Sequence, residues 1–144
     1  KKSCIDCYGD IFYDFIIIII ILKSKNKICI TYDKNFLRNW KKKFVDHLLD
    51  LESLKSKNNF LTEIGKSPQN INEIMSQYMG IIKITQKSWE IIKKSINNID
   101  YSTIDMTMFL YFLIKKNIKT ETVCVGYKWG EIDHFSDLEL YQNE

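Results

Sequence analysis

Short apolar runs near both ends of the chain are bounded by glycine or polar residues, as the strands of a sheet usually are. Ser3 to Tyr8 is apolar enough for a strand that Gly9 and Asp10 end, and Lys27 to Tyr32 is a second such run. The run from Thr122 to Val125 is short and continuous, which is typical of a strand buried on both faces. We therefore predict one sheet that takes strands from both ends of the chain.

The segment from Ile11 to Lys23 is ambiguous, because its six consecutive isoleucines favour a strand by propensity. Against this, Asp10 is a good N-cap, Asp14 lies in what would be the first turn, and lysines gather at the far end, as a helix dipole prefers. The segment is also long for a strand. We predict a buried helix here that joins two parallel strands.

Three further helices are predicted from apolar residues at helical spacing. The first runs from Lys34 to about Val45 with Asp33 as its cap, the second follows Thr85, and the third follows Asp105, which has capping-box spacing from Ser102. Their apolar positions are Phe36, Leu37, Trp40 and Phe44, then Trp89, Ile92 and Ile96, then Met106, Phe109, Leu110 and Leu113.

Between these helices the pattern predicts a β-hairpin formed by Leu49 to Lys55 and Asn59 to Ile64, with its turn at Ser56-Lys57-Asn58. Tyr78 to Thr85 then has the character of a strand in which Gly80 allows a close approach. Strands and helices alternate at both ends of the chain. The whole pattern predicts an α/β fold with a mostly parallel sheet, helices on both faces and a β-hairpin insert.

Composition agrees with one globular domain over residues 1–144. An apolar share of 45% supplies a core, and a net charge of +3 is too small to indicate a nucleic-acid surface. The run from Phe15 to Leu22 is too short to span a bilayer, and nearby aspartates make it a poor signal peptide. We expect a cytoplasmic protein that binds neither membrane nor nucleic acid.

The four cysteines are Cys4, Cys7, Cys29 and Cys124. Cys4 and Cys7 have C-x-x-C spacing, but no second pair follows, and in a strand their side chains point to opposite faces. The spacing therefore does not favour a metal site. We expect these residues to be small buried hydrophobes in a reducing compartment.

Two aspartates, Asp10 and Asp133, each follow a predicted strand and lie near opposite ends of the chain. In open α/β sheets the carboxyl ends of the strands are where ligands bind, so the two carboxylates are candidate metal ligands. Alternatively, Asp133 is only a turn residue or a helix cap, ahead of a helix that begins near Asp137 with Ser136 as cap.

Four segments in order resemble motifs of a known family. Tyr8-Gly9-Asp10-Ile11 resembles the first aspartate motif of the small nucleotidyltransferases with the Rossmann-like sugar-nucleotidyltransferase fold, and Trp129-Gly130-Glu131-Ile132-Asp133 resembles the second. Gln77-Tyr78-Met79-Gly80 and Asp105-Met106-Thr107 resemble the segments between them. The nearest branch is the cytidylyltransferases that act on phosphocholine or 2-aminoethylphosphonate.

The resemblance implies that a phosphate or phosphonate oxygen of the acceptor attacks the α-phosphate of CTP and that pyrophosphate leaves. Asp10 and Asp133 would then be the catalytic residues that hold Mg²⁺, which takes oxygen ligands. Such chemistry depends mainly on positioning and on neutralising charge, and it needs no protein nucleophile.

The resemblance also makes Tyr78, Asp50, Glu52, Trp129 and Glu131 candidates for substrate binding. Asp50 and Glu52 share a strand face and either attract a cationic acceptor or face water. Tyr78 faces the acceptor or the core. Trp129, with Trp40, either forms part of an aromatic cage for a cation or packs in the core. Glu131 either orients a metal-bound water or pairs with a lysine.

Family members carry a Gly-rich phosphate loop well before the first aspartate motif, and the chain has no room for it before Asp10. We therefore expect the chain to be the C-terminal portion of a nucleotidyltransferase-like domain and to be inactive alone. A sugar-1-phosphate nucleotidyltransferase and a non-catalytic binding domain are the alternatives. Asp50, Glu52 and the tryptophans favour a cationic acceptor over a sugar.

Overall fold

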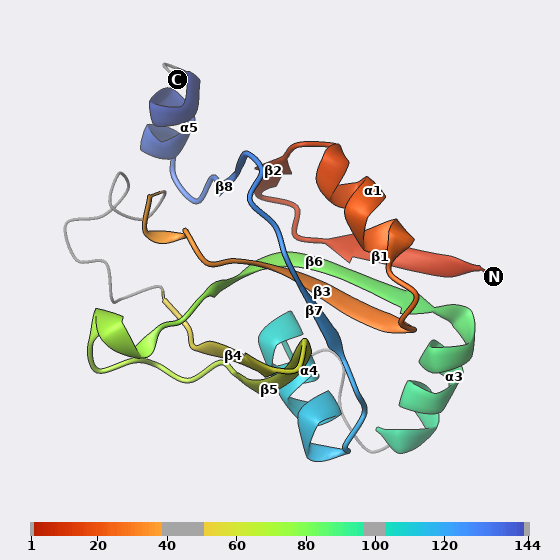
Figure 1. The fold of residues 1–144 in the computed structure, drawn as a ribbon. Coiled ribbons are helices and arrows are strands. Elements are labelled where there is room, and N and C mark those ends of the chain that lie inside the picture. The colour runs from red at the N-terminus through yellow and green to blue at the C-terminus, as the bar shows by residue number, and fades with distance from the viewer. Residues whose placement is uncertain (1, 39–50, 97–102, 143–144) are drawn as a thin grey trace.

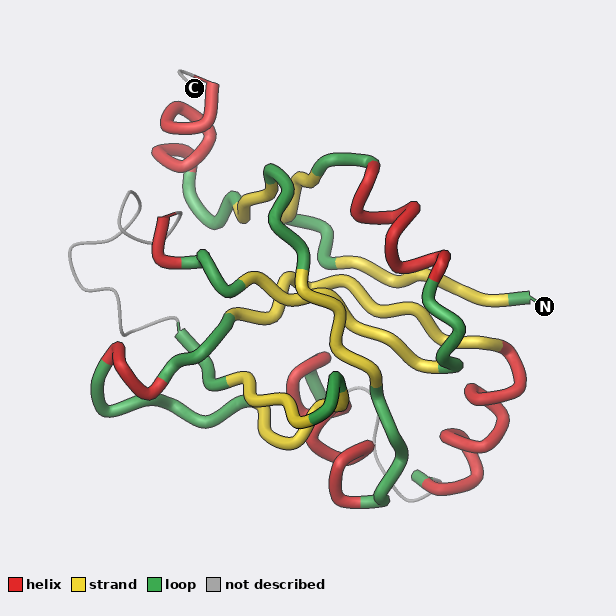
Figure 2. Tube along the Cα trace, in the orientation of Figure 1, coloured by secondary structure: helices red, strands yellow, loops and turns green. Residues whose placement is uncertain are grey.

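The computed structural model describes residues 2–38, 51–96 and 103–142, which build a central six-stranded sheet in the order β1-β6-β3-β7-β5-β4 (Figure 1). The strands of this sheet are β1 Ser3–Cys7, β3 Ile28–Asp33, β4 Leu54–Lys57, β5 Phe60–Ile64, β6 Gln77–Thr85 and β7 Glu121–Cys124. A second sheet pairs only β2 Ile11–Tyr13 with β8 Trp129–Glu131. The two short strands lie beyond one end of the main sheet (Figure 2).

Helices cover both faces of the main sheet (Figure 1). On one face, α1 Ile16–Lys23 buries Ile17 and Ile21 against a cluster that includes Cys29, Met79 and Ile81. On the other face of the sheet, α3 and α4 pack over a second hydrophobic core. These two helices are α3 Gln86–Ser95 and α4 Met106–Lys115. The described residues also form the short 3-10 helix η1 Ile71–Glu73 and the C-terminal α5 Phe135–Gln142.

The predicted α/β class, the helices on both faces and the hairpin insert are confirmed, but the prediction of a mostly parallel sheet is wrong. Among the described strands only β3 and β7 pair in parallel. The reason is the excursion between β3 and β6, which brings the chain back to the end of the sheet that it left. Asp33, the last residue of β3, pairs with Gln77, the first residue of β6, so β6 must run antiparallel.

The predicted helix from Ile11 to Lys23 is also partly wrong, because Ile11–Tyr13 forms β2 and α1 begins only at Ile16. Asp10 does not cap this helix, because the N-cap position is Phe15. The Asp10 carbonyl accepts a hydrogen bond from Ile132 N at 2.8 Å. The Asp14 carboxylate instead accepts from Ile16 N at 2.9 Å. The propensities of Ile11–Tyr13 did not distinguish strand from helix, and pairing with β8 makes this segment a strand.

The hairpin turn lies at Asn58 and Asn59, whose φ angles are 53° and 62°, and not at Ser56-Lys57-Asn58 as predicted. Two consecutive residues with positive φ are typical of a type I′ turn, and asparagine tolerates this conformation. The predicted helix from Lys34 to Val45 and the start of the first hairpin strand at Leu49 lie largely outside the described residues.

One helix cap is present as predicted, and in the predicted capping box of Ser102 and Asp105 the acid takes the place of the cap. Thr85 Oγ1 accepts from Ser88 N at 3.4 Å at the start of α3. Asp105 is itself the N-cap of α4 and accepts from Met108 N at 2.6 Å, whereas Ser102 lies outside the described residues. None of the described helices is long and apolar enough to cross a membrane.

The cysteines differ from expectation, because only Cys29 is buried, while Cys4, Cys7 and Cys124 are exposed. Cys4 and Cys7 belong to β1, which pairs with β6 and is the last strand at its side of the described sheet. Along this strand Ile5 is half-buried and the other residues are exposed. All four thiols are free.

Gly80 permits a close contact between β6 and Tyr8, and we predict that Gly80→Ala strongly destabilises the fold. Its φ is +74°, and an added Cβ would lie 2.5 Å from the Tyr8 ring. The left-handed backbone costs a residue with a side chain about 1–3 kcal/mol, and overpacking costs about 1–3 kcal/mol more. Urea denaturation at 25 °C measures the difference from wild type.

The matched control is Gly126→Ala, because a Cβ at Gly126 meets nothing within 4 Å. We expect this control to change the free energy of unfolding by less than about 0.5 kcal/mol, as surface substitutions usually do. Equal losses for the two variants would show that the contact with Tyr8 is not what requires glycine at position 80.

Candidate metal centre and substrate cavity

Three carboxylates gather beyond the end of the main sheet. One oxygen from each of Asp10, Glu131 and Asp133 lies within 4.8 Å of the others. The small β2–β8 sheet brings them together, because Ile11 pairs with Glu131 and the Asp10 carbonyl accepts from Ile132 N. Segments that are far apart in the sequence are thus joined directly at the cluster.

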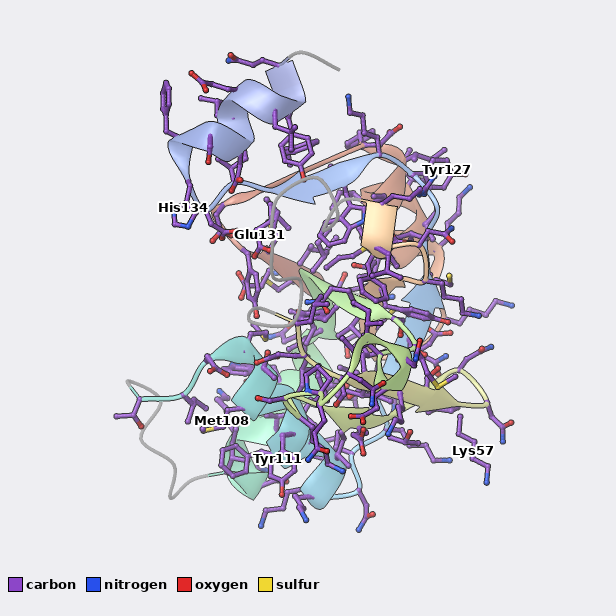
Figure 3. All side chains as sticks on the ribbon, turned by 90° about the vertical axis from the view of Figure 1, so that its left-hand side faces the viewer. Lys57, Met108, Tyr111, Tyr127, Glu131 and His134 are labelled. Carbon is purple, nitrogen blue, oxygen red and sulfur yellow. The ribbon has the colours of Figure 1, made fainter. Side chains whose placement is uncertain are left out.

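The backbone around Asp133 is held by the first turn of α5. The Asp137 carboxylate is 4% exposed and accepts from Asp133 N at 2.9 Å and from His134 N at 3.0 Å. This capping role was predicted for Ser136, but it is the Asp137 carboxylate that accepts these bonds. Glu131 and His134 lie near one another at the end of the molecule that carries α5 (Figure 3).

The donor set of this cluster fits Mg²⁺, which binds carboxylate oxygens and keeps several waters. Asp10 and Asp133 are exposed and Glu131 is half-buried, so water and phosphate oxygens can complete the coordination. Their role as metal ligands stays a prediction. Glu131, which was predicted to bind substrate, belongs to the cluster and also lines the adjoining cavity. Its two-residue spacing from Asp133 in an extended segment was the available signal.

A cavity of about 540 Å³ adjoins the cluster. Four carboxylates line it, and no lysine or arginine does so among the described residues. A phosphorylated substrate could enter this space only with its charge offset, whereas a positively charged group would be attracted directly. The polar lining residues are Tyr8, Glu52, Ser67, Gln77, Tyr78, Asp105, Thr107, Glu131, Asp133 and His134.

Tyr8 stands among these carboxylates. The pKa of its phenol is raised to about 12, first by burial and then by the charges of Glu52, Asp105 and Glu131, while the hydrogen bond with Thr107 acts in the opposite direction. Tyr8 therefore remains a neutral hydrogen-bonding group at any physiological pH. Neither Tyr8 nor Thr107 was selected from the sequence, and Asp105 was assigned only to capping.

Tyr78 packs edge-on against the ring of Tyr8, with ring centres 5.9 Å apart. It is 9% exposed, and its hydroxyl has no hydrogen-bond partner within the described structure. Burial raises the pKa of this phenol well above its usual value. The sequence left open whether Tyr78 faces the substrate or the core, and the structure shows it in both settings, since it also lines the cavity.

Among the other residues that were predicted to bind substrate, those that the structure describes line the cavity but differ in their burial. Glu52 is exposed and lines the cavity, whereas Asp50 and Trp40 lie outside the described residues. Trp129 lines the cavity but is 4% exposed, and its indole N–H donates to Asp33 Oδ2 at 2.9 Å. Trp129 is thus packed in the core with one side toward the cavity. Substrate binding by these residues stays a prediction.

The chain is similar to known nucleotidyl-transferring proteins, although no protein-family model matches it. It is 32% identical over 97% of its length to a CTP:phosphoglutamine cytidylyltransferase of Campylobacter jejuni, of which it spans 59%. Its fold matches the inositol-1-phosphate CTP transferase of T. maritima with a TM-score of 0.68 and 15% identity, covering 99% of this chain and 54% of the other.

A second solved structure, of a Bacillus anthracis protein described as a glucose-1-phosphate thymidylyltransferase, matches with a TM-score of 0.65 and 13% identity. The match covers 99% of this chain and 54% of that protein. At these identities the two structures establish the fold. The chain therefore spans between half and three fifths of the proteins that it resembles.

Proposed function

We propose that this protein transfers a cytidylyl group from CTP to a small phosphorylated acceptor, because the chain is similar over 97% of its length to a CTP:phosphoglutamine cytidylyltransferase. An oxygen of the acceptor phosphate or phosphonate attacks the α-phosphorus of CTP. The bond between the α-phosphorus and the bridging oxygen breaks, and pyrophosphate leaves with that electron pair. No group on the protein becomes covalently linked.

The observation that carries this proposal is the cluster of Asp10, Glu131 and Asp133 beside a cavity that can hold an acceptor. These carboxylates would hold Mg²⁺, which when bound offsets the phosphate charge that the acidic site otherwise repels. The chain's own contribution is to fix the carboxylates, through the β2–β8 sheet and through Asp137, before substrate arrives. Such preorganisation supports phosphoryl-type transfer.

We further propose that the acceptor carries a positive nitrogen, as phosphocholine does. The support is the charge of the cavity, where Glu52 and Asp105 stand close enough to Tyr8 to raise its pKa. The tyrosine rings of Tyr8 and Tyr78 add faces that attract cations. The relative in Campylobacter jejuni is named for phosphoglutamine, which makes phosphoglutamine the second acceptor to test.

The test is an assay of pyrophosphate release from CTP and Mg²⁺ with phosphocholine, 2-aminoethylphosphonate, phosphoglutamine, glucose-1-phosphate or inositol-1-phosphate. It should be run on the 144-residue chain and on the complete product of its gene. We propose that the chain alone is inactive, since it spans only 59% of the relative. If the complete gene product prefers a neutral sugar phosphate, the proposal of a cationic acceptor is wrong. If it transfers a cytidylyl group to none of these acceptors, a non-catalytic binding domain is favoured.

We predict that Glu52→Gln raises KM for the cationic acceptor in an active preparation about tenfold while KM for CTP stays nearly unchanged. Glu52 is exposed and lines the cavity, so the substitution removes charge from the acceptor site without opening the core. A loss of about 1.4 kcal/mol in binding corresponds to this factor. Initial rates at varied acceptor concentration measure it.

The control is Glu90→Gln on α3, where Glu90 pairs with Lys93 at 2.9 Å at the surface. This variant removes the same charge from a residue that does not line the cavity, and both KM values should remain those of wild type. If Glu52→Gln leaves the acceptor KM unchanged, Glu52 does not recognise the acceptor.

A further inference from the structure

Asp33 is a buried carboxylate for which the reaction provides no role. It is the last residue of β3 and is 3% exposed. Its Oδ1 accepts from the backbone N–H of Asn35 at 2.7 Å, and its Oδ2 accepts from the indole N–H of Trp129 at 2.9 Å. The second bond joins residues 96 positions apart in the chain.

Trp129 is the first residue of β8, two positions before Glu131. The hydrogen bond from Trp129 to Asp33 therefore links the main sheet to the small β2–β8 sheet that carries the carboxylate cluster. The chain reaches β2 through Gly9 and approaches β8 through Gly126, and a Cβ at either glycine would meet nothing within 4 Å. Packing at these glycines does not hold the small sheet in place.

Taking this proposed metal centre as given, we propose that Asp33 is a positioning residue that holds the carboxylate cluster at the end of the main sheet through its hydrogen bond to Trp129. The ring of Trp129 is 4% exposed and packs in the apolar core beside α1. The hydrogen bond to the Asp33 carboxylate fixes the orientation of this ring, because a hydrogen bond to an ionised group is short and directional.

The chemistry of Asp33 supports this role over simple core stability. Burying a carboxylate is costly unless donors satisfy it, and an apolar side chain of similar volume would stabilise a core at least as well. A metal centre, however, needs its ligands held within about 0.5 Å of the binding geometry. Groups that orient ligands from behind typically change metal affinity by about 10–100-fold when they are removed.

The experiment measures Mn²⁺ affinity by electron paramagnetic resonance for wild type, Asp33→Asn, Trp129→Phe and the double variant. Trp129→Phe keeps an aromatic ring but removes the donor, and Asp33→Asn keeps an acceptor of the same size but removes the charge. Each single variant should weaken Mn²⁺ binding about tenfold. The double variant should bind no more weakly than the worse single variant, because both changes break one interaction.

Circular dichroism confirms that each variant is folded at the temperature used, so that a general loss of stability does not enter the affinity. Trp89→Phe is the matched control, since Trp89 is 39% exposed on α3, and it should bind Mn²⁺ like wild type. Asp133→Asn tests the metal centre itself.

The two failures are distinguishable. If Asp133→Asn binds Mn²⁺ as wild type does, the proposed metal centre is wrong and the inference falls with it. If Asp133→Asn loses binding while Asp33→Asn and Trp129→Phe keep it, the metal centre stands and the positioning role of Asp33 is overturned. Additive losses in the double variant would also overturn it, because the two residues would then act separately.

Discussion

Replacing Asp133 by Asn should lower kcat for cytidylyl transfer about 100-fold or more in the active protein, with a much smaller change in KM for CTP. The substitution keeps the size of the side chain and removes one of three clustered negative charges. A bound metal contributes several kcal/mol to stabilising charge in the transition state, and each 1.36 kcal/mol corresponds to a factor of ten in rate. An interaction that is used mainly in the transition state affects kcat more than ground-state binding.

Asp14→Asn is the matched control for this experiment. Asp14 is exposed, lies four residues after Asp10 and caps the first turn of α1, and asparagine can accept the same hydrogen bond from Ile16 N. Its kcat should equal that of wild type. If Asp133→Asn keeps full kcat, or if the control loses as much, the cluster is not the catalytic metal centre.

The sequence led to two of the three clustered carboxylates by an argument that was only partly correct. Asp10 and Asp133 were expected together at the carboxyl edge of a parallel sheet. They are together because β2 and β8 pair with each other in a separate antiparallel sheet. The pairing of β2 with β8 could not be predicted from either segment alone, because each strand has only three residues. In addition, the isoleucine run after β2 is compatible with a strand as well as with a helix.

The residues that the sequence missed depend on contacts between distant segments. Tyr8 reaches the cavity because Gly80 opens space for its ring, and Thr107 reaches it from the first turn of α4. Both residues belong to segments that resemble family motifs, but nothing in those segments shows that their side chains line a cavity. Trp129, in contrast, was predicted to bind substrate because of its motif, but it is largely buried and donates a hydrogen bond to Asp33. Only the fold decides which aromatic faces the substrate.

Elements whose signals are local were predicted well. Thr85 caps α3 as expected, because a cap depends only on the next three residues. The helix α4 begins at Met106 as expected, although Asp105, which was predicted as the acid of a capping box, is itself the N-cap. Strand direction was predicted poorly, since the direction of β6 is set by the whole excursion between Asp33 and Gln77. The resemblance to cytidylyltransferases is confirmed. The phosphocholine branch stays a prediction, as the relative is named for another acceptor.

Divalent cations should reverse the order of stability between wild type and Asp133→Asn. In EDTA the three carboxylates of wild type repel one another across distances within 4.8 Å, so the variant should unfold at the same temperature or a higher one. With Mn²⁺ at about 100 times its dissociation constant, binding stabilises wild type by about 2.7 kcal/mol. For a domain of this size that raises Tm by roughly 5–10 °C, whereas the variant should gain much less.

Thermal unfolding followed by circular dichroism, with and without Mn²⁺, gives all four values, and Mg²⁺ at higher concentration should produce the same reversal. Asp14→Asn should behave like wild type in both conditions, because Asp14 lies outside the cluster. The decisive comparison is the loss caused by Asp133→Asn in EDTA. If the variant is destabilised there as much as in Mn²⁺, the Asp133 carboxylate stabilises the fold through contacts within the protein, and no cation is needed to explain why three acids lie together.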